Sequence, residues 1–352
     1  FFTPASVFGS PSAGDEAATQ VPRSASRRKW VILTVKLALA AVVVWAVGRH
    51  VARTWRDLHT HGQGITIDVG WMAVSVALYL AGLSAFGLYF WKVMQDSPTP
   101  VALAPAVRAY LVSHLGKYVP GKAMVVVIRA ALVVPYGSRP ATAAFATLYE
   151  TLVMMAAGSL MAGLGFLLRP IAPIPISFGS GVVVPLPVAE LSLALALAFF
   201  VPTLPRVFPR LSAWISLPFP GVGPESLPRF SWSLLAVGIL CAWVGWALLG
   251  LSQVAVVRAL RPSGVPIQAW PLVFASVALA TSAGFAVAVL PAGLGVRELV
   301  IMTTLAPAVG PDLAVVSALA LRLAWVIGEV LAAVVLAVVR PPLPLPLPRP
   351  AP

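Results

Sequence analysis

The chain has 352 residues, of which 59% are hydrophobic and only 10% are charged. Soluble domains use roughly 45–50% apolar residues, so this composition excludes an ordinary soluble protein and indicates an integral membrane protein. The formal net charge of +13 would suit nucleic acid, but the cations are spread over short loops between apolar runs, where anionic lipid is the better counterpart. The single cysteine, Cys241, excludes an internal disulfide.

The two ends of the chain differ from its apolar middle. Residues 1–29 form a polar N-terminal tail that ends in basic residues, and we predict that this tail is disordered. Residues 341–352 repeat Pro and Leu, which is typical of an extended, polyproline-like arm. Residues 30–340 therefore remain as one transmembrane domain.

Long apolar runs follow one another through this domain. A helix needs about 20 apolar residues to cross the hydrocarbon core, and helices satisfy their own backbone groups there. Lys and Arg favour the loops on the side of the N-terminus, which predicts a cytoplasmic N-terminus. We predict an all-α bundle of about seven to eight spans. The runs are Trp30–Val47, Trp71–Trp91, Ala141–Leu168, Pro187–Leu204, Trp232–Val257, Trp270–Leu290 and Leu313–Val339.

Two further apolar segments, Ala123–Val134 and Leu299–Ala308, are too short to cross. Short apolar segments bounded by Gly and Pro are typical of re-entrant half-helices that line a site near the middle of the membrane. Short interfacial helices or parts of kinked spans are the alternatives. Four predicted spans lie between the two segments, which puts both on one side of the membrane, whereas an inverted repeat would put them on opposite sides. Either the repeat is not inverted, or a span is merged or missed in this count, with residues 100–119 as the candidate region.

Cations surround the turns that precede these two segments. A turn at membrane depth exposes backbone N–H groups, and the half-helix that begins there directs its positive end at the same place. An anion is the natural occupant, and a lipid phosphate is the anion most available. Glycine lets the backbone approach such a ligand closely. We predict that phosphate is bound by Lys117, Gly121, Lys122, Arg129, Gly293, Gly295 and Arg297, with His114 beside them.

Other charged residues lie inside apolar runs, where each is costly unless it is paired or wetted. Arg322 and Glu329 are seven residues apart, so they share nearly one face of a helix. Glu150 can pair with either Arg129 or Arg322, and a purely structural ion pair is the plain alternative throughout. We predict intramembrane ion pairs that involve Glu150, Glu298, Arg322 and Glu329.

The sequence patterns that would indicate catalysis or metal binding are weaker than those that indicate anion binding. His50, His59 and His61 share one loop, but their spacing lacks a third ligand, so we predict no metal site. No Ser-His-Asp arrangement or nucleotide-binding glycine loop is evident, and we predict neither a catalytic residue nor a cofactor.

Three segments resemble one known family. "HLGKYVPGKAMVVVIRAALV", "LPAGLGVRELVIMTTLA" and "ALALRLAWVIGEVLAA" resemble two Gly- and Pro-rich elements and the final span of the lysylphosphatidylglycerol synthase transmembrane-region family. The resemblance covers about residues 30–340. Thr151 and Ala292 depart from the residues frequent there, arginine and glycine. The matching positions are Gly116, Lys117, Tyr118, Pro120, Gly121, Lys122 and Arg129, then Pro291, Gly293, Leu294, Gly295, Arg297 and Glu298, then Arg322 and Glu329.

The resemblance implies a multi-pass protein of the inner (plasma) membrane that moves an anionic lipid, phospho- or polyprenyl-phosphate-linked, between leaflets. The cytosolic aminoacyl-transferring domain of the synthases has no counterpart in the sequence, so we expect no enzyme activity. Anionic lipid and bilayer are the expected partners, with a lipid-modifying enzyme or glycosyltransferase as a protein partner and no nucleic acid. The alternatives are a membrane-embedded glycosyl- or acyltransferase, with Glu150 or Glu298 as base, and a non-transporting partner subunit.

Overall fold

A computed structural model describes residues 67–119, 123–178, 182–217, 226–287, 295–339 and 341–342, together with Trp45, Arg49 and Arg56. All of them lie within one compact unit, residues 43–352. Nearly all of the first predicted span, Trp30–Val47, lies outside the described residues, as do the N-terminal tail and the residues His50, His59 and His61.

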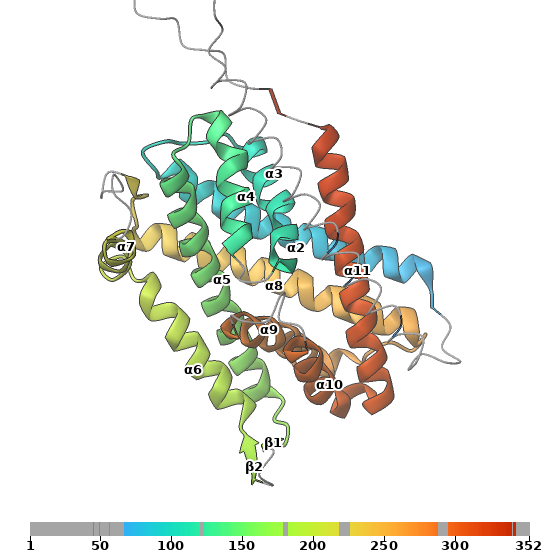
Figure 1. The fold of residues 1–352 in the computed structure, drawn as a ribbon. Helices are drawn as coiled ribbons and strands as arrows, with labels where there is room; N and C mark the ends of the chain where they lie inside the picture. The colour runs from blue at the N-terminus through green and yellow to red at the C-terminus, as the bar shows by residue number, and fades with distance from the viewer. Residues whose placement is uncertain are drawn as a thin grey trace, which may run out of the picture. The chain divides into compact units, whose positions relative to one another are not determined.

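The described part of the chain is a helical bundle, which confirms the predicted fold class (Figure 1). Two short antiparallel strands, β1 (Ile174–Phe178) and β2 (Val182–Leu186), connect α5 to α6. Short 3₁₀ turns join several helices and are labelled η. The helices are α2 (Val69–Gln95), α3 (Leu103–Ser113), η1 (His114–Tyr118), α4 (Ala123–Val133), η2 (Val134–Tyr136), α5 (Pro140–Leu168), α6 (Val188–Phe200), η3 (Val201–Thr203), α7 (Phe208–Ser216), α8 (Trp232–Leu260), η5 (Ile267–Ala269), α9 (Trp270–Ala286), α10 (Val296–Val309) and α11 (Pro311–Val338).

Five of the described helices are long and apolar enough to cross a membrane: α2, α5, α8, η5 with α9, and α11. A sixth span results if α6, η3 and α7 are taken together, although they bend by 75°. The span predicted over Pro187–Leu204 corresponds to α6 with η3, and the bend follows it, before α7. Pro202 and Pro205 explain the bend, since proline has no N–H to donate and its ring clashes with the preceding turn.

Two helix pairs position the candidate site. In the first helix pair, α3 packs against α4, and η1 follows α3; in the second helix pair, α9 packs against α10. The predicted short segments are thus the helices α4 and α10, and α10 contains Pro307. The region near residues 100–119 contains α3, which has 11 residues and is too short to be the missing span.

The long helices α2 and α8 pack along each other and support both helix pairs. Their contact requires glycine at Gly245, because a Cβ there would run into the ring of Phe86. Asp68 caps the start of α2, and its carboxylate accepts the Gly70 N–H at 2.8 Å. On the same helix, the Tyr79 ring stacks on Trp325 of α11, with ring centroids 4.5 Å apart. This stack forms one wall of the candidate site.

Candidate functional site

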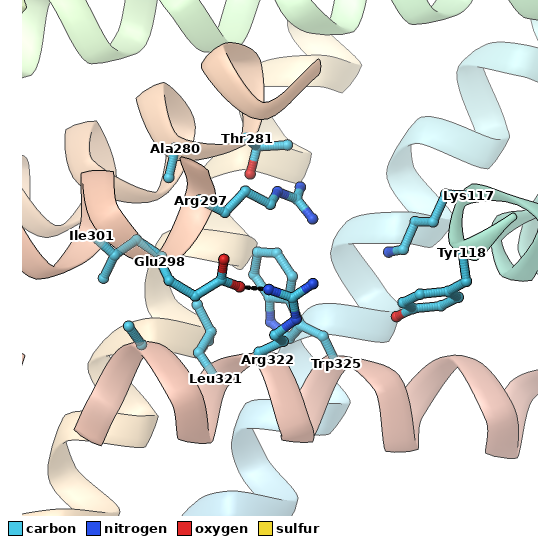
Figure 2. A pocket seen from close by; sticks show the side chains of 11 residues that line it. Lys117, Tyr118, Ala280, Thr281, Arg297, Glu298, Ile301, Leu321, Arg322 and Trp325 are labelled. Atoms are coloured by element: carbon cyan, nitrogen blue, oxygen red, sulfur yellow. Dashed lines mark ion pairs between the residues drawn. The ribbon is translucent and has the colours of Figure 1, made fainter. Parts of the chain in front are cut away.

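Lys117 of η1 and Arg297 of α10 line the same narrow pocket, whose volume is about 30 Å³. Figure 2 shows the two side chains pointing toward one another, with Thr281 of α9 beside Arg297. We call this space the polar pocket. Its other lining residues are Tyr118, Ala280, Glu298, Ile301, Ala318, Leu321, Arg322 and Trp325.

A larger cavity of about 510 Å³ adjoins the polar pocket, since Lys117, Thr281, Arg297 and Trp325 line both spaces. We call it the apolar cavity, because hydrocarbon and aromatic side chains form most of its wall. These side chains include Phe86, Leu148, Met154, Met155, Phe199, Trp246, Leu249 and Phe285. A charged pocket that opens into an apolar cavity suits a ligand with a polar head and an apolar body.

Lys117 is held by a carboxylate and a phenol. Its Nζ donates to Glu329 Oε1 of α11 and lies 3.4 Å from the hydroxyl oxygen of Tyr79, which donates to the same carboxylate oxygen. Glu329 is 1% exposed, and its other oxygen, Oε2, is buried with no hydrogen-bond partner among the described residues. The ion pair therefore ties η1 to α11 and α2.

Arg297 has a different environment. Within the described part of the chain, the guanidinium of Arg297 forms no ion pair; it lies over the Trp325 ring, 5.7 Å from the centroid. Trp325 is fixed in turn, because its indole N–H donates to Ser252 Oγ at 3.0 Å. An arginine over an aromatic face keeps its fork of N–H groups available for a planar or tetrahedral oxyanion.

Glu298, the neighbour of Arg297, fixes the start of α10. One oxygen of its carboxylate pairs with the guanidinium of Arg322 on α11 (Figure 2), and the other accepts the Gly295 N–H at 2.8 Å. Gly295 has φ +82°, a conformation that side-chain-bearing residues rarely adopt. Because both oxygens are engaged, Glu298 holds α10 against α11 and orients Arg297.

A buried ion pair lies on the wall of the apolar cavity. Arg129 of α4 and Glu150 of α5 are 2% and 1% exposed, and Arg129 Nη1 donates to Glu150 Oε2 at 3.1 Å. Arg129 Nε also donates to Ser113 Oγ at 3.0 Å, and the Tyr110 hydroxyl donates to Glu150 Oε1 at 3.1 Å. The Arg129 guanidinium lies 4.1 Å from the Tyr110 ring centroid. Arg129 therefore has a carboxylate partner, whereas Arg297 forms no ion pair among the described residues.

The structure brings most of the predicted site residues together. Lys117, Arg297, Glu298 and Arg322 line the polar pocket, whereas Arg129, Glu150 and His114 line the apolar cavity. Gly121, Lys122 and Gly293 lie outside the described residues. Phosphate binding by any of the predicted site residues, described or not, stays a prediction. Of the two partners considered for Glu150, the structure selects Arg129.

Sequence reasoning missed three residues at the site: Tyr79, Thr281 and Trp325. Trp325 carried a signal, since tryptophan prefers the membrane interface and this one lies in the middle of an apolar run. Tyr79 and Thr281 have no comparable signal, because single hydroxyl groups are common within membrane helices. No group of three or more metal-ligating side chains gathers anywhere in the described ranges.

Comparison with known proteins supports a membrane role. No curated protein gives a significant match to the chain. The family model described as "Lysylphosphatidylglycerol synthase TM region" matches residues 33–333, which is most of the sequence. With its long apolar helices, the chain is a multi-pass integral membrane protein. It belongs to the lysylphosphatidylglycerol synthase transmembrane-region family.

Proposed function

We propose that this protein binds the head group of an anionic lipid between Lys117 and Arg297 and carries that lipid across the bilayer. One observation carries the proposal: Arg297, which forms no ion pair among the described residues, faces Lys117 across a pocket that continues into an apolar cavity. The lipid would be phospho- or polyprenyl-phosphate-linked.

The chemistry of the two cations fits a phosphate group. Arginine can bind two phosphate oxygens at once through parallel N–H groups, whereas lysine acts as a point charge. Trp325 backs the guanidinium of Arg297, and the Glu298 contacts fix the helix turn from which it projects. A site with low water content strengthens each of these interactions, so a cation without an ion pair favours an anion over a head group that has no charge.

The positions of the two cations support the proposed movement across the bilayer. Lys117 belongs to the first helix pair and Arg297 to the second, so a displacement of one pair relative to the other changes access to the polar pocket. Alternating access in transporters uses such movements around a site of fixed composition. The proposed role needs neither a catalytic residue nor a cofactor.

The environment of the glutamates favours transport over group transfer. A glycosyl- or acyltransferase needs a general base near the lipid phosphate, and Glu150 and Glu298 are the candidates. Glu150 pairs with Arg129, and Glu298 pairs with Arg322 while it caps α10. Both carboxylates are therefore engaged in structural contacts rather than open to a substrate.

The experiment is lipid movement in reconstituted vesicles with labelled phosphatidylglycerol or a labelled neutral glycolipid, which has no phosphate. A hydrogen bond to a charged group contributes about 1.5–3 kcal/mol, so we expect the anionic lipid to move about tenfold to a hundredfold faster. Protein-free vesicles give the background. Equal rates for the two lipids would contradict the proposal, and a new lipid product that disappears in Glu150→Gln would favour the transferase.

A further inference from the structure

We propose that Glu329 takes up one proton when the anionic head group binds, so that lipid and proton cross the membrane together. This inference rests on the proposed function and adds a second substrate, the proton, to the same site. The observation behind it is the one-sided environment of the Glu329 carboxylate.

Two hydrogen bonds to that carboxylate converge on one oxygen, and the Tyr118 side chain also interacts with the carboxylate. Lys117 Nζ and the Tyr79 hydroxyl donate to Oε1, while Oε2 is buried without a hydrogen-bond partner among the described residues. The side chain is fully buried in its ion pair with Lys117. A buried carboxylate oxygen without a donor is costly, and it is a place where a proton can be added without displacing an existing contact.

The charges around Glu329 come from several elements. Lys117 is the cation that forms its ion pair, and Arg297 acts on the same cluster from α10 without an ion pair to any described residue. Arg322 and Glu298 neutralise each other. The titratable and charged groups that act directly on Glu329 are Tyr79 of α2, Lys117 and Tyr118 of η1, and Arg297 of α10. Arg322 of α11 acts on Lys117 and Tyr118 in the same cluster, and it is paired with Glu298 of α10.

An arriving phosphate competes with Glu329 for Lys117. If the lysine turns to the phosphate, Glu329 keeps a buried negative charge without its cation, which is strongly unfavourable. If the lysine stays between them, two anions share it, and like charges at close range favour protonation of one. In both cases a proton on Oε2 removes the conflict.

The proton comes from water at the mouth of the cavity and forms an O–H bond at Oε2, and Lys117 is then available to the phosphate. When the lipid leaves, the O–H bond gives its proton back to water and the Lys117–Glu329 ion pair forms again. No oxidant, reductant or other reactant takes part. By linkage, acid tightens lipid binding by the same factor by which lipid favours protonation.

The test counts protons directly. Purified protein in detergent is titrated with short-chain, water-soluble phosphatidylglycerol at pH 7 in two buffers with different enthalpies of ionisation. The difference between the two calorimetric enthalpies gives the number of protons taken up, and we expect about one per lipid bound. The Glu329→Gln variant should bind lipid without taking up a proton. The control variant Glu190→Gln changes an exposed glutamate at the start of α6 and should behave as the wild type.

The wild-type measurement decides the proposal even if the Gln variant fails to fold. Lipid binding without proton uptake would overturn the coupling and leave the proposed function standing, whereas no lipid binding and no transport would overturn both. His114 has a buried, unpartnered Nδ1 in the apolar cavity. Uptake that persists in Glu329→Gln and is lost in His114→Ala would place the proton elsewhere and overturn the assignment to Glu329.

Discussion

Replacing Arg129 by alanine is expected to destabilise the protein by about 3–5 kcal/mol, because it leaves Glu150 buried, charged and without its cation. Glu150 would retain the Tyr110 hydroxyl, but one neutral hydrogen bond replaces little of what a buried ion pair supplies. Loss of the guanidinium also removes its contacts with Ser113 and with the rings of Tyr110 and Phe90. The effect should spread through α3, α4 and α5, which this cluster joins.

Unfolding in mixed micelles with increasing SDS would measure this loss. The double variant Arg129→Met/Glu150→Leu should recover most of it, since replacing both members of a buried pair by apolar groups is often close to neutral. Arg206→Ala, at an exposed arginine, is the matched control and should change the free energy of unfolding by less than about 0.5 kcal/mol. A loss under about 1 kcal/mol for Arg129→Ala would show that the pair is not a structural element.

Arg297→Ala is expected to show the opposite behaviour: a large loss of transport with little loss of stability. A bidentate arginine–phosphate contact contributes about 3 kcal/mol, which corresponds to about a hundredfold lower rate of phosphatidylglycerol movement. Stability should change little, because no carboxylate in the described ranges loses an ion-pair partner with Arg297.

The measurement uses the same vesicles as the lipid-selectivity experiment, at matched protein density. Arg297→Lys, which keeps the charge but not the fork of N–H groups, should fall between alanine and wild type. Arg210→Ala changes an exposed arginine on α7 and should leave the rate unaltered. If phosphatidylglycerol moves equally fast in Arg297→Ala and in the wild type, Arg297 does not bind the carried lipid. If both rates equal that of protein-free vesicles, the protein is better described as a non-transporting partner subunit.

The sequence predicted the long helices closely, because an apolar run of membrane-crossing length is a strong physical constraint. It missed α3, whose 11 residues include Pro105 and Arg108 and present no long apolar run. It predicted α6 with η3 as one span, Pro187–Leu204, but missed α7 beyond the bend, whose nine residues include Pro209 and Arg210.

For the site, the sequence identified charged residues but not all of their partners. Local elements singled out Lys117, Arg129 and Arg297, and the final span singled out Arg322 and Glu329. The pairings Arg322–Glu298 and Lys117–Glu329 depend on how α10, α11 and η1 approach one another in space. Periodicity within one helix contains no such information. The same reasoning explains why the Tyr79–Trp325 stack was not foreseen.

The central claim is that Lys117 and Arg297 bind one lipid phosphate between them. Its most direct test is a structure of the protein determined in a phosphatidylglycerol bilayer. Our account predicts a lipid phosphate in the polar pocket, at about 3 Å from both Lys117 Nζ and the guanidinium of Arg297, with hydrocarbon in the apolar cavity. Lipid phosphates found only along the outer surface of the bundle, with Lys117 and Arg297 contacting none of them, would contradict it.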